Sequence, residues 1–382
     1  MDPHTRLPAD PRSPRARLAA VSRPIVEINT LAELVALGGR LDGVALQGIV
    51  VPPGLIDWAA ADVAGLTLLG VRFEDPAEEA TARARGALVF PRFPDRPYDA
   101  YRTTLYTEDE LNAVVHSGSG TLDAAIYRHY EDAGRDHPDV VESLAQRIHD
   151  HAIDDALSEL LETIDRPIVG IMGGHNLSRA DPLFALTAEL ARRLTLNGFI
   201  VATGGGPGAM EAANLGGLCG RLDADGLAEL VAGLADAPHW QDEAWGDVAT
   251  QVRAGIASGS TTLGLPTWFY GHEPTNRFAT HIAKYFSNSV REDRLLALAN
   301  GGVVFTPGGP GTVQEVFQDA AQNIYETFGP AAPMVFLGAE EWDRSGVVPL
   351  ISTMAAKKRT SVSITVTDDL DVVVEAMLAG MT

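Results

Sequence analysis

The chain has 382 residues, and at about 150 residues per domain this length predicts two domains, with three as the alternative. Hydrophobic residues make up 46% and charged residues 21%, a composition that excludes disorder or a fibrous structure for most of the chain and indicates a sizeable core. The 51 acidic and 29 basic residues give a formal charge of -22, which argues against nucleic acid or an anionic membrane as a partner. An anionic ligand would therefore need a local positive pocket.

The apolar runs, the cysteine and the lysines limit where the protein is expected to act and which reactions it can catalyse. No apolar run approaches the ~20 residues of a membrane helix, and the N-terminus shows no apolar signal core, so we expect a cytoplasmic protein. The single cysteine, Cys219, excludes an internal disulfide and a thiolate metal cage. Only three lysines are present, Lys284, Lys357 and Lys358, which limits the candidates for Schiff-base chemistry.

The first part of the chain is expected to hold a tail and a smaller domain. Residues 1–22 are rich in proline, arginine and aspartate without periodicity, which predicts a disordered tail. Residues 23–137 are interpreted as an N-terminal α/β domain, in which Gly43, Gly65 and Gly86 precede short apolar runs at spacings of 22 and 21 residues. This period fits stacked strand repeats, and three weak copies fit ordinary strands of an α/β domain equally well.

Apolar residues at helical spacing from 138 to 162 predict one long amphipathic helix. Residues 138–165 are accordingly interpreted as a helix that links two domains. His149 and His151 are two residues apart on it and face different ways, so we expect solvated histidines and not metal ligands.

After residue 165, short apolar runs alternate with helical segments. This alternation is typical of a parallel sheet with helices on both faces, so residues 166–382 are predicted to form a Rossmann-like, doubly wound α/β domain. In such sheets ligands bind at the carboxyl ends of the strands, where the loops that follow the runs should meet. The runs are residues 168–172, 199–202, 261–265, 303–306, 333–337 and 362–366.

Glycine-rich loops follow the first two runs. After the loop at residues 173–178, Asp181 stands where it would cap a helix, with Pro182 at the first helical position. The second loop, residues 203–210, leads into a helix whose positive N-terminus suits a phosphate or a ribose. Glycines are also needed for tight turns and helix–sheet packing alone, so this pattern is only moderately specific.

The loop after the fourth run, residues 307–315, is richer in polar groups. Its glycines expose backbone amides, Thr312 offers a hydroxyl, and Glu315 is expected in the first turn of the following helix. Upstream lies Arg291, a residue type that grips phosphate with two parallel hydrogen bonds. A purely structural Glu315, stabilised by the helix dipole, is the alternative interpretation.

These residues resemble the LOG (Lonely Guy) family of nucleoside 5'-monophosphate phosphoribohydrolases. The family motif PGGxGTxxE is met from Pro307 to Glu315, and GGH at 173–175 and GPGAM at 206–210 are similar to the longer bacterial pyrimidine/purine nucleotide 5'-monophosphate nucleosidases. The resemblance covers roughly residues 166–340 and implies hydrolysis of the N-glycosidic bond to free base and ribose 5-phosphate, without a metal or redox cofactor. It also implies a homodimer or a larger homo-oligomer.

The resemblance carries the family's catalytic pair over to Arg291 and Glu315. In the family the arginine is usually followed by lysine, whereas Glu292 follows here, and the spacing to the motif is one residue longer. Arg294 therefore stays open as the alternative catalytic arginine.

The other expected contacts come from the glycine loops and from a substrate loop made of Pro266 and residues 272–276. Amides at 309–312 would hold the 5'-phosphate, and His175 and Glu273 would either contact the sugar or base or only structure their loops. The residues expected to bind the substrate or its phosphate are Gly174, His175, Gly205, Gly206, Gly208, Met210, Glu273, Asn276, Gly308, Gly309, Gly311 and Thr312.

Other functions fit the same residues to different degrees. A non-catalytic nucleotide-binding sensor would use the same pocket, and transfer of the ribosyl phosphate to an acceptor other than water is not separable by sequence. A pyridoxal phosphate enzyme needs a lysine beside its phosphate loop, and no lysine lies near either glycine turn. After the motif, Phe317, Ile324, Tyr325 and Phe328 at helical spacing indicate either a surface for a partner subunit or core packing.

Overall fold

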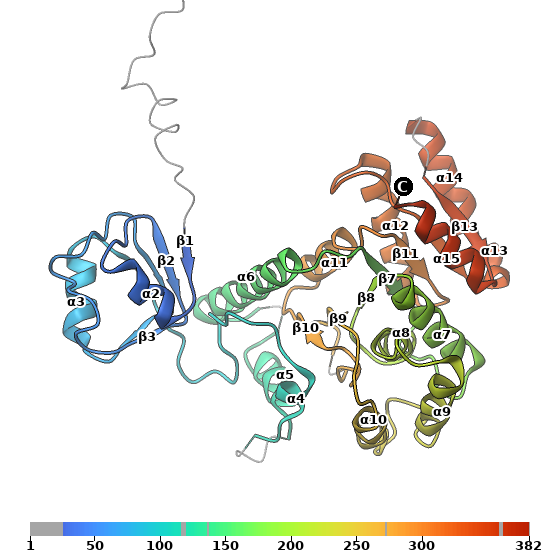
Figure 1. Cartoon of the computed structure of the whole chain (residues 1–382), viewed down its shortest axis with the longest axis horizontal. Coiled ribbons are helices and arrows are strands. Elements are labelled where there is room, and N and C mark those ends of the chain that lie inside the picture. The colour runs from blue at the N-terminus through green and yellow to red at the C-terminus, as the bar shows by residue number, and fades with distance from the viewer. Residues whose placement is uncertain (1–25, 116–119, 136, 272, 359–361, 382) are drawn as a thin grey trace, which may run out of the picture. The chain divides into compact units, whose positions relative to one another are not determined.

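The computed structural model of this chain describes residues 26–115, 120–135, 137–271, 273–358 and 362–381, and it divides into two compact units (Figure 1). The N-terminal unit runs to Asp95 and includes Asp99–Thr103, and the C-terminal unit contains Arg96–Tyr98 and the chain from Thr104 onward. The tail predicted at residues 1–22 lies outside the described residues. Among the helices that are described, none has the length and apolarity to cross a bilayer.

Parallel strands form the N-terminal unit. Four of them pair in the order β1-β2-β4-β6, and β3 pairs with β5 in a second, two-stranded sheet. Ala45 lies opposite Thr67, which lies opposite Leu88, so the 22- and 21-residue spacings bring successive repeats side by side in register. The elements are β1 (Val26–Ile28), α2 (Leu31–Leu37), β2 (Val44–Gln47), β3 (Val50–Val51), β4 (Thr67–Leu69), β5 (Arg72–Phe73), α3 (Pro76–Ala84) and β6 (Leu88–Phe90).

The glycines of the repeat form the turns ahead of these strands. Gly43 and Gly65 have φ values of +69° and +71°, a left-handed conformation that glycine adopts without strain. The Gly43 N–H donates to the Ala64 carbonyl at 2.9 Å, which ties one turn to the next. Leu46 and Leu68 of the paired strands are fully buried, so stacking the repeats creates the core of this unit.

The C-terminal unit begins with three helices, α4 (Glu108–Asn112), α5 (Leu122–Asp132) and α6 (Val140–Glu162). The long helix predicted from 138 to 162 is present as α6, but the division between the units falls near residue 103 and not at residue 137. Long-range contacts explain this difference. Asp123 on α5 forms a buried ion pair with Lys284 at 2.7 Å and accepts a hydrogen bond from Trp268 Nε1 at 2.8 Å, which fastens α5 to the C-terminal unit.

One prediction for α6 is wrong, because His149 is fully buried and not solvated. Its Nε2 lies 2.8 Å from the Tyr106 hydroxyl, and its ring centroid lies 5.7 Å from that of Trp268 and 5.0 Å from that of Phe286. These partners lie far from His149 in the sequence, so helical periodicity gives no sign of them. His151, on another face of α6, is exposed as expected.

A seven-stranded sheet in which all strands are parallel organises the rest of the unit and confirms the predicted α/β fold class. Its order is β10-β9-β8-β7-β11-β12-β13. The strands are β7 (Ile168–Met172), β8 (Ile200–Thr203), β9 (Thr262–Gly264), β10 (His281–Ile282), β11 (Val303–Phe305), β12 (Met334–Leu337) and β13 (Ile364–Thr367). The helices are α7 (Pro182–Leu196), α8 (Ala209–Leu218), α9 (Ala224–Leu234), α10 (Trp245–Ala254), α11 (Asn288–Ala297), α12 (Pro310–Tyr325), α13 (Ala339–Ser345), α14 (Val347–Lys358) and α15 (Leu370–Ala379).

The direction of strand addition reverses at β7. From β7 the chain adds β8, β9 and β10 on one side, and then adds β11, β12 and β13 on the other. Because parallel crossovers are right-handed, this reversal places α12 and α14 on the face of the sheet opposite α7 and α8. The reversal leaves a crevice outside the carboxyl ends of β7 and β11, where ligands bind in open α/β sheets.

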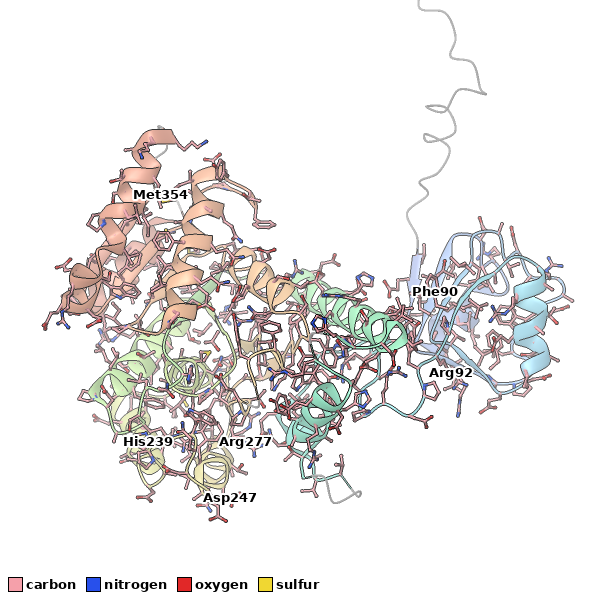
Figure 2. All side chains as sticks on the ribbon, turned by 180° about the vertical axis from the view of Figure 1, so that it is seen from behind. Phe90, Arg92, His239, Asp247, Arg277 and Met354 are labelled. Carbon is pink, nitrogen blue, oxygen red and sulfur yellow. The ribbon has the colours of Figure 1, made fainter. Side chains whose placement is uncertain are left out.

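The four apolar residues predicted after the motif differ in burial, and Phe317 on α12 is half-buried. Ile324 on α12 is 7% exposed and packs in the core, whereas Tyr325 and Phe328 are 64% and 60% exposed. Leu350 and Met354 on the neighbouring α14 are also exposed, and Met354 is labelled in Figure 2. Tyr325 and Phe328 are therefore accessible on the surface, whereas Ile324 belongs to the core.

Candidate functional site

A cavity of about 470 Å³ opens at the carboxyl ends of the central strands, where the strand order reverses. Four segments surround it, namely the loops after β7, β8 and β9 and the N-terminal part of α12, and Arg291 of α11 completes the wall. Its lining residues are Met172, Gly173, Gly174, His175, Gly204, Gly206, Met210, Pro266, Thr267, Tyr270, Gly271, Glu273, Arg291, Gly309, Pro310, Gly311, Thr312, Gln314 and Glu315.

Four of the predicted binding residues do not line this cavity. They are Gly205, Gly208, Gly308 and Asn276. Gly208 has a φ of +70°, and a Cβ atom there would lie 2.4 Å from the Gly174 carbonyl oxygen, so a glycine is needed where these two loops touch. Asn276 is fully buried, and its Nδ2 donates to the Gly206 carbonyl at 3.0 Å. These positions shape the loops that form the cavity.

The N-terminus of α12 opens into the cavity. Asp181 caps α7 with its side chain as predicted, but α12 has Gly309 at its N-cap and no side-chain cap among the described residues. Cβ atoms added at Gly309 or Gly311 would meet nothing within 4 Å, so the space in front of these amides is open. The uncapped N–H groups and the helix dipole together favour an anion at this point.

The position of Glu315 in α12 differs from the expectation. The helix begins at Pro310, so Glu315 lies in the second turn and not in the first. The helix dipole acts mainly within the first turn, which weakens the purely structural explanation for this carboxylate.

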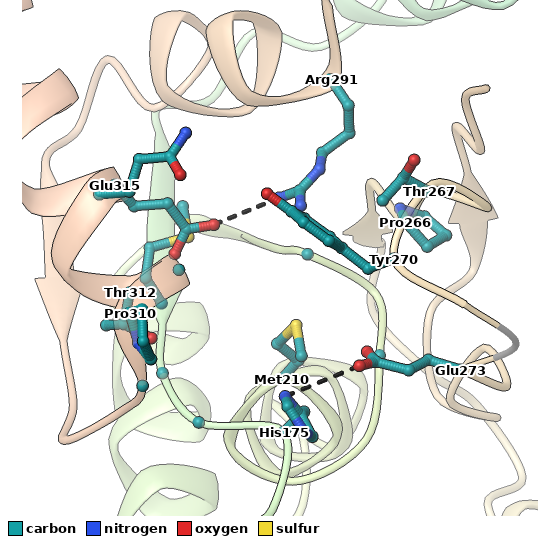
Figure 3. A pocket seen from close by; sticks show the side chains of 18 of the residues that line it. His175, Met210, Pro266, Thr267, Tyr270, Glu273, Arg291, Pro310, Thr312 and Glu315 are labelled. Carbon is teal, nitrogen blue, oxygen red and sulfur yellow. Dashed lines mark hydrogen bonds and ion pairs between the residues drawn. The ribbon is translucent and has the colours of Figure 1, made fainter. Parts of the chain in front are cut away.

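Arg291 and Glu315 lie next to each other in the wall of the cavity (Figure 3). Arg291 Nη1 donates to Glu315 Oε1 at 3.2 Å, and the two side chains are 9% and 12% exposed. Burial raises the pKa of Glu315 above its ordinary value; the charge of Arg291 opposes this shift and the charge of Glu292 adds to it. The site therefore holds a carboxylate whose basicity exceeds that of a solvated glutamate.

Arg294 does not reach the cavity. Its Nε lies 3.0 Å from Asp154 Oδ1, and its Nη2 donates to Ser158 Oγ at 2.5 Å, so its side chain binds α6. Of the two arginines that the sequence left open, Arg291 is the one placed beside Glu315.

The opposite side of the cavity carries His175 and Glu273, whose Nδ1 and Oε1 atoms are 3.7 Å apart (Figure 3). Both line the cavity and are partly exposed. His272, part of the predicted substrate loop, lies outside the described residues, whereas Pro266 of that loop lines the cavity.

Sequence reasoning missed several lining residues, above all Tyr270 and Gln314. The Tyr270 hydroxyl accepts a hydrogen bond from Asn288 Nδ2 at 2.9 Å, which holds the tyrosine over the cavity. An available signal was the aromatic run Trp268–Tyr270, which follows the predicted strand 261–265 after two residues. Gln314 stands at a variable position of the motif.

Among the described residues, no group of three His, Cys, Asp or Glu side chains could hold a metal ion. The cavity lining also contains no lysine, and Lys284 is engaged by Asp123 in the buried ion pair. The groups of the cavity that can act on a ligand include the Arg291–Glu315 ion pair, a second carboxylate, a histidine, the hydroxyls of Thr312 and Tyr270, and the backbone amides.

No profile of a known protein family matches this sequence, and no curated protein matches it. Among solved structures, the chain is similar to the molybdenum cofactor binding protein from Rippkaea orientalis, at 15% identity and a TM-score of 0.35, over 57% of this chain and 99% of that one. It is also similar to the Moco carrier protein from Chlamydomonas reinhardtii, at 21% identity and a TM-score of 0.34, over 56% of this chain and 98% of that one.

Proposed function

We propose that the protein hydrolyses the N-glycosidic bond of nucleoside 5'-monophosphates and releases the free base and ribose 5-phosphate. One observation carries the proposal: the Arg291–Glu315 pair, in which the side chains are 9% and 12% exposed, and the uncapped N-terminus of α12 face the same cavity. A phosphorylated sugar that reaches from the amides to the carboxylate would occupy that cavity.

The 5'-phosphate binds to the amides at the start of α12. Gly309 and Gly311 leave open space there, and the helix N-terminus supplies partial positive charge. In a chain with a formal charge of -22, this local site answers the need for a positive pocket. A nucleoside without its phosphate would lack this anchor and would be poorly positioned.

Glu315 acts at the sugar. Cleavage of the bond between C1' and the base nitrogen passes through an oxocarbenium-like sugar, which a nearby carboxylate stabilises. Glu315 also takes a proton from the water that attacks C1', so the C1'–O bond forms as the C1'–N bond breaks. The nitrogen of the leaving base takes a proton from solvent water, and Glu315 then returns its own proton to the solvent. General-base action of this kind typically contributes about 10²- to 10⁴-fold to the rate. Arg291 holds the carboxylate in place through the 3.2 Å hydrogen bond.

The base occupies the apolar part of the cavity. Met210, Pro266 and Tyr270 line this part and present flat or flexible surfaces to a planar ring. His175 and Glu273 are available for polar contacts with the sugar or the base.

A panel assay tests the proposal. The protein is incubated with AMP, GMP, CMP, UMP and IMP, and free base and ribose 5-phosphate are measured. Glu315→Gln, which preserves shape but removes the base, should lower turnover by about 10²-fold or more with the fold unchanged by circular dichroism. Release of base from no nucleotide would refute the hydrolase; tight nucleotide binding without release would identify a sensor. Wild-type turnover by the variant would reject the role of Glu315.

A further inference from the structure

A chain of hydrogen bonds on α11 leads to the candidate catalytic pair. It runs from Glu292 through Asn288 to Arg291. Arg291 Nη2 donates to Asn288 Oδ1 at 2.9 Å, and Asn288 Nδ2 donates to Glu292 Oε1 at 2.7 Å. All three residues are at most 9% exposed, so water competes little for these bonds. Arg291 is therefore anchored on one side by Glu315 and on the other by Asn288.

The carboxylate of Glu292 decides which way the Asn288 amide points. An ionised carboxylate only accepts hydrogen bonds, so it requires the NH₂ end of the amide to face it. The Tyr270 hydroxyl accepts from the same Nδ2 at 2.9 Å. The carbonyl end of Asn288 is left facing Arg291, which is the orientation that a guanidinium requires.

The second oxygen of Glu292 reaches α12. Gln314 Nε2 donates to Glu292 Oε2 at 2.6 Å, and Gln314 directly precedes Glu315 in the chain. Glu292 thus connects the helix that carries the arginine to the helix that carries the acid.

We propose that Glu292 is a positioning residue of this site, which holds the Asn288 amide and the Gln314 side chain so that Arg291 stays aligned with Glu315. The inference rests on the proposed function of the pair. It explains why a buried acid, 4% exposed, lies beside a pair that already contains one carboxylate.

Charge gives Glu292 a second effect on the same pair. Burial is the main cause of the raised pKa of Glu315, and the negative charge of Glu292 raises it further against the opposing charge of Arg291. Tyr270, His175 and Glu273 are the other titratable groups that line the cavity. Because a base works only when it is deprotonated, removal of the Glu292 charge should extend activity to lower pH.

Two substitutions separate positioning from charge. Glu292→Met removes the acceptor for Asn288 at similar volume, and we expect kcat/KM to fall by about tenfold to hundredfold for loss of hydrogen bonds to charged groups. Glu292→Gln retains an acceptor without the charge, so it should recover most of kcat/KM and shift the acidic limb of the pH profile to lower pH. The control is Asp293→Asn, since Asp293 is the neighbouring acid on α11 and also accepts from a glutamine of α12, Gln318, but is exposed and lies outside the cavity lining.

A merely structural role predicts a different pattern. In that case Glu292→Met would lower the melting temperature, while kcat/KM per folded protein and the pH profile would match the wild type, and this result would overturn the proposal. An equal loss in Asp293→Asn would overturn it as well.

Crystal structures of these variants supply a readout that needs no activity. Arg291 should separate from Asn288 in Glu292→Met and keep the contact in Glu292→Gln and Asp293→Asn. If the wild type releases no base, the hydrolase proposal fails, but the Arg291 position still decides the role of Glu292. An unmoved Arg291 in Glu292→Met would reject the positioning role.

Discussion

Asp319 allows a quantitative prediction about stability. It lies on α12 one turn beyond Glu315, is 5% exposed, and its Oδ2 has no hydrogen-bond partner within the described residues. Burial raises the pKa of this carboxyl from 3.8 to about 7. At about 1.36 kcal/mol per pKa unit, this shift corresponds to about 4 kcal/mol between the protonated and ionised forms of the folded protein.

The direction of the pH dependence follows from this shift. Between pH 4 and 7, roughly, the folded protein keeps a proton on Asp319 that the unfolded chain has lost. The free energy of unfolding should therefore fall as the pH rises through this window. Above about pH 7 the folded protein should bear the full cost of a buried, ionised Asp319. Asp319→Asn removes the ionisable group at the same volume, so at pH 8 the variant should be more stable than the wild type by up to about 4 kcal/mol.

Urea unfolding followed by tryptophan fluorescence measures this difference, because four of the five tryptophans lie in the C-terminal unit. The measurement is made from pH 5 to pH 8.5 at one protein concentration. Asp343→Asn, at an exposed position on α13, is the control and should change stability by less than about 0.5 kcal/mol. If Asp319→Asn has the same pH slope as the wild type, Asp319 is not a buried, unpaired acid and the reasoning is refuted.

Two further predictions concern the arginines and the surface of α12. Arg291→Gln should lower kcat/KM by about tenfold to hundredfold, because it removes the hydrogen bond to Glu315. Arg294→Gln, which loses contacts with α6, should leave kcat/KM near the wild-type value. Steady-state kinetics on the best nucleotide substrate measures both effects, and the reverse order would contradict this prediction. Tyr325→Glu combined with Phe328→Glu should convert a homo-oligomer to monomer in light scattering, and a wild type that is already monomeric would reject this surface.

Much of the local structure could be predicted from the sequence because it depends on neighbours in the chain. The strand β7 coincides with the predicted run 168–172, and α6 with the predicted long helix, since burial imposes a hydrophobic period on each element. The cap at Asp181 follows from side-chain chemistry within one turn. The sequence also predicted that a ligand would bind at the carboxyl ends of the strands, because these ends meet at one edge of a parallel sheet.

The parts that sequence did not give depend on which residues meet from distant segments. Arg291 and Arg294 are three residues apart on one helix, and only the packing of α11 against α12 and α6 decides that the first faces Glu315 and the second faces Asp154. His149 is buried because aromatic residues from other segments cover it.

The glycine loops also combine features that the sequence predicts with features that only the tertiary structure decides. The glycines indicate that the backbone comes close to another group, but the sequence alone does not say whether that group belongs to a ligand or to another loop. The tertiary structure decides it position by position: Gly309 faces open space at the cavity, whereas Gly208 lies against the Gly174 carbonyl. A glycine in the sequence shows that a side chain would not fit at that position. The atom with which the side chain would clash belongs to a distant segment, and only folding brings that segment close.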